Sequence, residues 1–188
     1  MKPFLGEFPA PADLFTKLAQ YLELLLVWNR RTNLTALREP EQIITRHFGE
    51  SLFAAQLLAP KLESGAMVLD FGSGAGFPGV PLGLLLPEVR VILGESQNKK
   101  ATFLREVVRT LGLSNVQVHA GRVESLPAAT LFEAVTMRAV DDPELAATEA
   151  AKRVAPGGWL VSLQGGEEAE GMVAIPGSER RFVRLEQR

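Results

Sequence analysis

The chain has 188 residues, 46% hydrophobic and 22% charged, a composition typical of one globular domain with a substantial core and a short extension. It has no cysteine and only two histidines, which excludes disulfides, thiolate nucleophiles and cysteine-ligated metals and disfavours a histidine metal site. The net charge of −2 excludes a general basic surface, so any nucleic-acid partner must be met by local patches.

The N-terminal third of the chain predicts a helical extension. Residues 1–10 hold two prolines and a glycine, and we expect them to be loosely ordered. Apolar residues then recur at helical spacing over 11–30. Pro40 fits the first position of a second helix, which Gly49 breaks or kinks. Residues 60–65 form the linker to the first strand.

From residue 66 onward, strand and helix patterns alternate as a parallel sheet requires. The expected strands are 66–70, 90–95, 116–120, 132–137 and 159–163, followed by an antiparallel pair at 171–175 and 181–185. The expected helices are 79–86, a helix from Asn98 as N-cap to Gly112 as stop, and 141–153, after which 156–158 forms a turn. We predict an α/β fold in which the extension 1–65 precedes a core 66–188 as one structural unit.

A glycine-rich turn follows the first expected strand. The apolar run 67–69 stops at Asp70, and Gly72, Gly74 and Gly76 follow at alternate positions. Glycines let the backbone turn sharply and let a ligand lie against bare main chain. A ligand-free strand–helix turn is the alternative, and the neighbouring residues favour the binding site.

The details of this turn separate two classes of ligand. The dinucleotide fingerprint requires a glycine where Phe77 stands. Asp70, at the end of the strand, is badly placed for a pyrophosphate and well placed for an amino or sulfonium group. The pattern acid-x-Gly-x-Gly-x-Gly resembles the first motif of class I S-adenosylmethionine-dependent methyltransferases, and we prefer that interpretation to a nicotinamide site.

Three further strand ends supply candidate cofactor residues at the same edge of the sheet. Glu95 ends the second strand, where a carboxylate accepts hydrogen bonds from ribose hydroxyls. Val123 and Glu124 follow the third strand, where a backbone amide and a carboxylate can meet an adenine. Arg138 closes the fourth strand, and its alternatives are a role in the cleft or a salt bridge to a neighbouring acid.

Basic residues elsewhere are candidates for RNA contact. Lys99, Lys100 and Arg105 open a helix, and contact with phosphate and a solvated helix face are equally compatible with them. Arg46 and His47 lie on the second helix of the extension, where a structural role for the histidine is the main alternative.

Five segments together resemble the RsmG family, also called glucose-inhibited division protein B, of bacterial 16S rRNA guanine-N7 methyltransferases. They are N33-L-T-A-L-R-E-P40, R46-H-F-G-E-S51, V68-L-D-F-G-S-G-A-G-F-P-G-V-P81, E95-S-Q-N-K-K100 and R122-V-E124. The resemblance covers residues 20–165, with a weaker similarity at 180–185. It implies a class I methyltransferase (Rossmann-like) fold with a mostly parallel seven-stranded sheet and an N-terminal helical part.

The resemblance also implies a cofactor and a substrate. The cofactor is S-adenosylmethionine, and the family's cofactor positions correspond to Gly72, Phe77, Glu95, Val123, Glu124 and Arg138. The substrate is one guanine in 16S rRNA of the small ribosomal subunit. Three positions depart from the family pattern: Glu50 and Glu95 replace the usual Asp, and Gln164 replaces a Lys near the active edge.

The predicted reaction is in-line transfer of the sulfonium methyl to guanine N7, which carries no proton and needs no general base. A different acceptor, a nicotinamide oxidoreductase and a non-catalytic RNA-binding module are the alternatives. The apolar run 24–27 is too short to span a bilayer and no secretory leader opens the chain, so we expect a cytoplasmic protein without membrane or metal partners. We expect a monomer.

Overall fold

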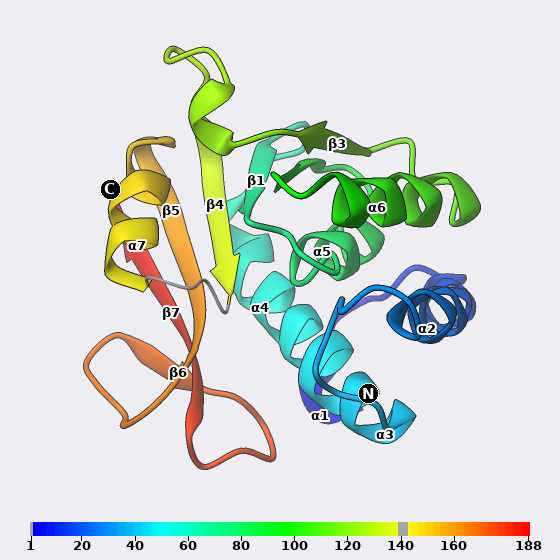
Figure 1. The fold of residues 1–188 in the computed structure, drawn as a ribbon. Coiled ribbons are helices and arrows are strands. Elements are labelled where there is room, and N and C mark those ends of the chain that lie inside the picture. Colours follow the sequence, from blue (N-terminus) through cyan, green and yellow to red (C-terminus); the bar gives the residue numbers. More distant parts are fainter. Residues whose placement is uncertain (1, 139–142) are drawn as a thin grey trace.

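A computed structural model describes residues 2–138 and 143–188 of the chain. The described residues form one seven-stranded sheet in the order β3-β2-β1-β4-β5-β7-β6 (Figure 1). The strands are β1 Met67–Phe71, β2 Arg90–Glu95, β3 Val116–Ala120, β4 Phe132–Arg138, β5 Val154–Gly165, β6 Met172–Ala174 and β7 Arg181–Gln187. β1 to β5 pair in parallel and β6 pairs antiparallel with β7, as the sequence predicts. β7 is also antiparallel to β5, which the sequence did not predict.

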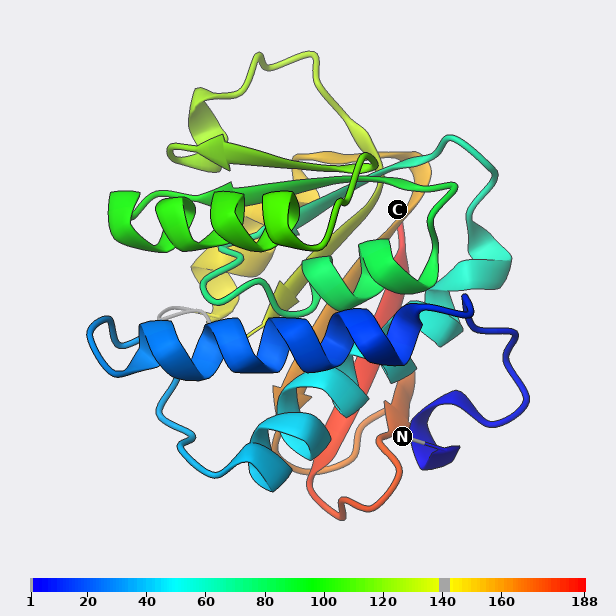
Figure 2. The ribbon, with the colours of Figure 1, turned by 90° about the vertical axis from the view of Figure 1, so that its right-hand side faces the viewer.

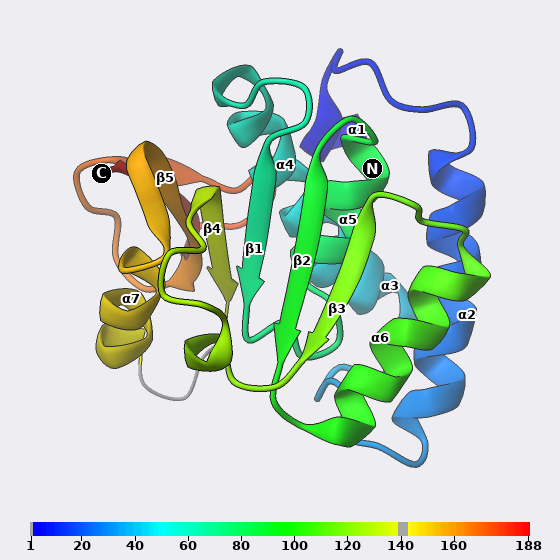
Figure 3. The same ribbon diagram turned by 90° about the horizontal axis from the view of Figure 1, so that it is seen from above.

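Helices cover both faces of this sheet. They are α1 Lys2–Leu5, α2 Leu14–Asn29, α3 Pro40–Ile43, α4 Glu50–Leu58, α5 Gly79–Leu85, α6 Asn98–Thr110 and α7 Pro143–Ala151. The helices α4, α5 and α6 pack on one face, and α7 lies on the other (Figures 1 and 3). α2 lies outside α5 and α6 and forms a third layer there (Figure 2). The extension therefore covers one side of the core.

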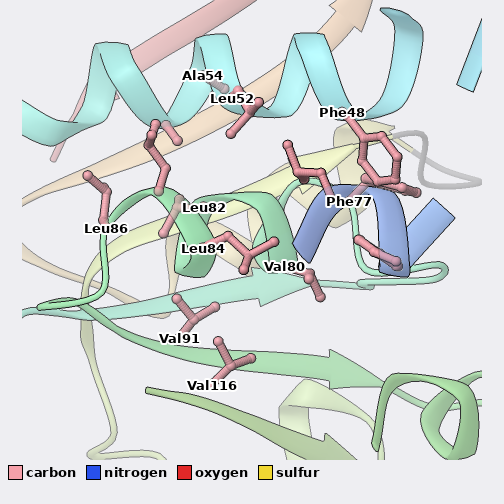
Figure 4. Close-up of a cluster of buried hydrophobic side chains, with 14 of the residues drawn as sticks. Phe48, Leu52, Ala54, Phe77, Val80, Leu82, Leu84, Leu86, Val91 and Val116 are labelled. Carbon is pink, nitrogen blue, oxygen red and sulfur yellow. The ribbon is translucent and has the colours of Figure 1, made fainter. Parts of the chain in front are cut away.

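Two hydrophobic clusters hold these layers together. Val68 of β1 belongs to the cluster under α4, α5 and α6, and its neighbour Leu69 belongs to the cluster under α7. This alternation follows from the two-residue period of a strand that is buried on both faces. Side chains of the extension, among them Phe48 and Leu52, pack directly on residues of the core (Figure 4).

The structure contradicts two expectations about the extension. The N-terminal residues are ordered as α1, and Phe4 is buried. Of the break or kink expected at Gly49, the structure excludes the break, because a π-helical stretch, Ile44–Gly49, joins α3 to α4 without interruption. A Cβ on Gly49 would lie 2.5 Å from the ring of Phe4, so the glycine serves the close approach of α1.

Two further expectations about the core are wrong in detail. Asn98 is the first residue of α6 and Gln97 occupies the N-cap position, although Gly112 follows the helix with a φ of 61° as expected. The predicted turn at 156–158 lies inside β5, where the register of the β4–β5 pairing shifts. Of the helix predicted at 141–153, residues 141 and 142 lie outside the described residues, and α7 ends at Ala151.

Candidate functional site

The turn after β1 leaves the sheet through left-handed glycines. Gly72, Gly74 and Gly76 have φ angles of 70°, 58° and 90°, a region that residues with a Cβ rarely adopt. The amide of Ser73 donates a hydrogen bond of 2.9 Å to the Gly94 carbonyl, which ties the turn to β2. The glycine spacing in the sequence therefore reflects a real conformational requirement.

A cleft of about 550 Å³ opens beside this turn, at the edge where β1, β2 and β4 end. One wall consists of strand ends and the loops after them, and includes Gly72, Gly74, Phe77, Glu95 and Glu124. A second wall comes from the extension and consists of Leu34, Thr35, Ala36 and His47, and α7 contributes Leu145, Ala146 and Glu149 to the lining. The cleft is therefore built jointly by the extension and the core.

Glu95 lines the cleft and is only 5% exposed. Its Oε2 accepts a hydrogen bond of 2.9 Å from the Gly74 amide, and its Oε1 accepts one of 2.7 Å from the Gln97 amide. These two bonds fix the carboxylate between the glycine turn and the start of α6. The structure thus places Glu95 and the turn together, as a shared role in binding a nucleoside requires.

The loop after β3 brings a second carboxylate to the cleft. Glu124 lines it, whereas the side chain of Val123 is buried in the cluster under α7. A Cβ on Gly94 would lie 2.7 Å from Val123, so the glycine in β2 makes room for this loop. Only the main chain of Val123 remains as a candidate for ligand contact.

Asp70 is not among the lining residues, which differs from the expectation that its carboxylate meets the ligand. It is 1% exposed, and it accepts hydrogen bonds from the Gly79 amide at 3.2 Å and from the Thr136 hydroxyl at 2.9 Å. Burial raises its pKa to about 6. The carboxylate therefore joins β1 to β4 and to the start of α5, and β1 and α5 are the elements that flank the glycine turn.

Arg138 combines the two roles that the sequence left open. It forms a salt bridge of 3.0 Å with Glu50 and donates a hydrogen bond of 2.6 Å to the Arg46 carbonyl. It also lines the cleft, and its buried Nη1 has no hydrogen-bond partner among the described residues. Burial lowers its pKa to about 10, so the guanidinium remains charged at neutral pH.

His47 faces the cleft from the π-helical stretch. Its ring stacks on Phe77 at 4.7 Å between centroids, and its Nε2 lies 2.7 Å from the Thr35 hydroxyl. Burial, together with the smaller effect of the charges of Arg138, Arg46 and Arg181, lowers its pKa to about 3. His47 is therefore a neutral imidazole at physiological pH.

Of the other basic candidates, one lines the cleft and three do not. Lys100 lines the cleft. Lys99 is exposed on α6, and Arg46 lines a separate cavity beside β7, so neither belongs to the cleft wall. Arg105 is also exposed and lies outside the wall. Gln164 donates a hydrogen bond of 3.4 Å to the sulfur of Met172, so its amide is directed to β6.

Sequence reasoning missed two buried residues that shape the cleft. The side chain of Asn29 donates to the carbonyls of Thr35 and Leu37 and accepts from the amides of Leu34 and Thr35, with distances of 3.0 to 3.3 Å. The Tyr21 hydroxyl donates to the Ala75 carbonyl in the glycine turn. The only available signal was an asparagine and a tyrosine on the apolar side of a helix.

Comparison with known proteins assigns the chain to a family. The family model GidB, described as rRNA small subunit methyltransferase G, matches residues 14–178. The chain belongs to this family. A "Ribosomal RNA small subunit methyltransferase G" of Xanthomonas campestris pv. campestris (strain B100) is 37% identical over 169 residues, which cover 90% of this chain and 77% of the relative.

A second relative of the rRNA small subunit methyltransferase G family, from Xylella fastidiosa (strain M23), is 40% identical over 159 residues, 85% of this chain and 73% of the relative. Among solved structures, a SAM dependent methyltransferase from Aquifex aeolicus has a TM-score of 0.60 at 21% identity and covers 82% of this chain and 96% of its own. The latter likeness shows the class I methyltransferase fold, which confirms the predicted fold class.

As a member of this family, the chain is an S-adenosylmethionine-dependent methyltransferase. The cleft fits that cofactor. Its left-handed glycines leave the main chain open to a ligand, and the carboxylates of Glu95 and Glu124 can accept hydrogen bonds from hydroxyl and amino groups. The Nη1 of Arg138, which has no partner among the described residues, can donate to the cofactor's carboxylate. Within the described part of the chain, no helix is long and apolar enough to cross a membrane. The same residues contain no group of three His, Cys, Asp or Glu side chains suited to a metal ion.

Proposed function

We propose that this methyltransferase transfers a methyl group from S-adenosylmethionine to N7 of a guanine in 16S rRNA. The observation that carries the proposal is the single cleft in which the glycine turn, Glu95 and Glu124 face a wall from the helical extension. The family membership supports rRNA of the small subunit as the acceptor. The choice of N7 rests on the family alone.

The strand-end wall holds the cofactor in this proposal. Gly72 and Gly74 let it approach the main chain, and Glu95 accepts from the ribose hydroxyls. Glu124 and the main chain of Val123 recognise the adenine, and Phe77 closes the side of the cleft next to the extension. Arg138 provides positive charge for the cofactor's carboxylate. Asp70 acts indirectly, because it fixes the strand and helix that flank the turn.

The protein's chemical contribution is position. When bound, S-adenosylmethionine supplies an electrophilic methyl group on its sulfonium sulfur. Guanine N7 has an in-plane lone pair and no proton, so no residue has to act as a base. Alignment of reacting atoms is worth about 7–11 kcal/mol of barrier. His47 suits this reaction because its lowered pKa keeps it neutral, and it therefore adds no charge that would repel the cationic product base.

The extension wall and the basic residues near it form the proposed acceptor side. The guanine has to leave its stack to enter the cleft, and Thr35 and His47 are the polar side chains that this wall offers. Lys100 at the cleft and the exposed Lys99 and Arg46 near it can meet RNA phosphates. In this proposal, Lys99, Lys100 and Arg46 supply positive charge for RNA where the chain as a whole has a net charge of −2. We propose a monomer that acts in the cytoplasm, where its substrate is made.

The test is methyl transfer to small-subunit rRNA. We expect the purified protein to transfer labelled methyl from S-adenosylmethionine to 16S rRNA or 30S particles, with N7-methylguanine as the product at one site. Mapping rRNA from cells with and without the gene locates that site. Cofactor binding without methylation of either substrate would show that the acceptor is wrong, and a melting temperature raised by nicotinamide dinucleotides alone would show that the cofactor is wrong.

A further inference from the structure

A buried arginine lies behind the loop that carries Glu124. Arg153 stands between α7 and β5 and is 8% exposed. It lines a cavity of about 190 Å³ that shares Phe71, Glu124 and Glu149 with the cofactor cleft. Arg153 therefore does not line the cleft itself but lies behind residues that do. Neither the sequence motifs nor the proposed reaction assigns it a role.

The guanidinium of Arg153 is directed at main-chain carbonyls of the loop 123–127. Its Nη1 donates to Pro127 O at 2.8 Å. Its Nη2 lies within hydrogen-bond distance of the Val123, Leu126 and Glu124 carbonyls, at 3.1, 3.0 and 3.4 Å. Among the carboxylates that the structure describes, none forms a salt bridge with it. The carbonyls of this short 3₁₀ turn therefore serve as the partners of a buried cation.

These contacts add to the buried side chain of Val123 and to the contact of 3.1 Å between the Ser125 hydroxyl and Nε2 of His119, which also hold this loop. The backbone bonds within it are Ser125 N to Arg122 O at 3.0 Å and Leu126 N to Val123 O at 3.1 Å. Arg153 binds the carbonyl of Glu124 and those of residues on both sides of it, so it fixes the direction in which the Glu124 carboxylate leaves the main chain. A lysine keeps the charge but cannot spread donors over four carbonyls, because its ammonium is a single point.

We propose that Arg153 is a positioning residue for recognition of the adenine amino group, which it achieves by holding the loop 123–127 against the cleft. The inference rests on the proposed cofactor site, in which Glu124 accepts from that amino group. It predicts that Arg153 influences the discrimination between adenine and hypoxanthine, a base of similar shape with a carbonyl oxygen in place of the amino group. A residue that only stabilises the fold has no reason to affect that discrimination.

The experiment is calorimetric titration of the full-length protein with S-adenosylhomocysteine and with its deaminated analogue S-inosylhomocysteine. We expect the wild type to bind the adenosine form at least about tenfold more tightly, because the inosine form places a carbonyl oxygen, which cannot donate, where Glu124 accepts from the amino group. In Arg153→Lys, affinity for the adenosine form falls about tenfold and affinity for the inosine form falls less, so the preference shrinks. The KM for S-adenosylmethionine rises while kcat and the KM for rRNA stay unchanged.

Arg90→Lys is the control, an exposed arginine whose hydrogen bonds lie away from the loop 123–127. Arg90 also donates to a carbonyl, that of Gly65 at 3.1 and 3.2 Å, but at the opposite edge of the sheet. This variant should keep the wild-type preference. If Arg153→Lys does not melt cooperatively, Arg153→Gln, which keeps two N–H donors, takes the same test.

The outcomes distinguish the two proposals. An equal loss of affinity for both compounds in the Arg153 variants, or no loss, would overturn the positioning role and leave the cofactor site intact. Failure of the wild-type protein to bind either compound would overturn the cofactor site itself, and the inference about Arg153 with it.

Discussion

The two walls of the cleft owe their shapes to different interactions. The strand-end wall is shaped by a five-residue turn whose glycines adopt left-handed φ angles. The extension wall consists of a loop, Leu34 to Ala36, and of His47, which are brought together by the side-chain contacts of Asn29 and Thr35. The first wall is a property of consecutive residues, and the second is a property of packing.

The walls also depend on each other. Tyr21 of α2 donates to the carbonyl of Ala75, 54 residues away, and its ring stacks on Phe77 at 5.4 Å between centroids. A Cβ on Gly76 would lie 2.5 Å from the Tyr21 hydroxyl. The glycine at this position is thus required both by its φ of 90° and by contact with the extension. We conclude that the extension shapes the turn and also forms its own wall of the cleft.

Removal of residues 1–65 tests this dependence most severely. Tyr21, Leu25 and Leu52 of the extension are fully buried in the same cluster as Val80 and Leu82 of the core, so a fragment 66–188 exposes a large apolar surface. We expect the fragment to lack a cooperative thermal transition by circular dichroism and to bind no S-adenosylhomocysteine. A fragment that melts cooperatively and binds the ligand would show that the two parts are separable.

Two glycine variants distinguish the packed side of the turn from its open side. Gly76→Ala should lower the free energy of unfolding by roughly 2–5 kcal/mol, the sum of a left-handed alanine and an overpacked contact.

Gly74→Arg carries a similar backbone cost, but a Cβ there meets only Gly72 O, at 3.9 Å. It should fold and lose S-adenosylhomocysteine binding. Urea denaturation and calorimetry measure the two effects, and unaltered binding by Gly74→Arg would contradict the site.

Two titratable residues, His47 in the extension wall and Asp70 buried behind the strand-end wall, should contribute to stability with opposite dependence on pH. Asp70 has a folded pKa of about 6, above its ordinary value, so its contribution to stability is largest at low pH and is lost as pH rises through 6. His47 has a folded pKa of about 3, below its ordinary value, so its contribution is present above pH 6.5 and is lost as pH falls.

Single variants separate these opposing contributions. Relative to the wild type, His47→Gln should gain stability when pH falls from 7 to 4.5, and Asp70→Asn should lose stability over the same range. The shift for Asp70 amounts to up to about 3 kcal/mol between the two pKa values. Urea denaturation at both pH values measures the effect. The same pH dependence in both variants would show that burial does not set these pKa values.

The smallest expected effect comes from the bond that joins the walls. Tyr21→Phe keeps the aromatic packing but leaves the Ala75 carbonyl without its donor, so it should cost about 1–2 kcal/mol of stability and weaken S-adenosylhomocysteine binding about fivefold. Trp28→Phe is the control, since it removes a bond of 3.0 Å from α2 to Glu106 on α6, away from the turn. It should lower stability without changing ligand affinity.

Much of the core could be predicted from the sequence. The bounds of β2 and β3, the antiparallel closing pair and the glycine turn follow from local patterns, because a buried strand needs an apolar run and a left-handed φ needs glycine. The meeting of Glu95 and Glu124 at one edge follows from the parallel sheet, whose strand ends share that edge.

The failures have a common physical cause. Gly49 has the sequence signature of a helix break, but the approach of Phe4 decides its role. Asp70 has the signature of a ligand contact, but its burial beside Thr136 makes it a support. In each case a residue far away in the chain changes the meaning of a local pattern.

By itself, the sequence determined the succession of strands and helices along the chain, the left-handed glycines of the turn and the family, because these depend on short runs of residues and their spacing. Only the tertiary structure decided which side chains face the cleft, that Arg138 is paired with Glu50, and that Arg153 holds the loop of Glu124. These features depend on hydrogen bonds and packing between segments that are far apart in the chain, so no local sequence pattern predicts them.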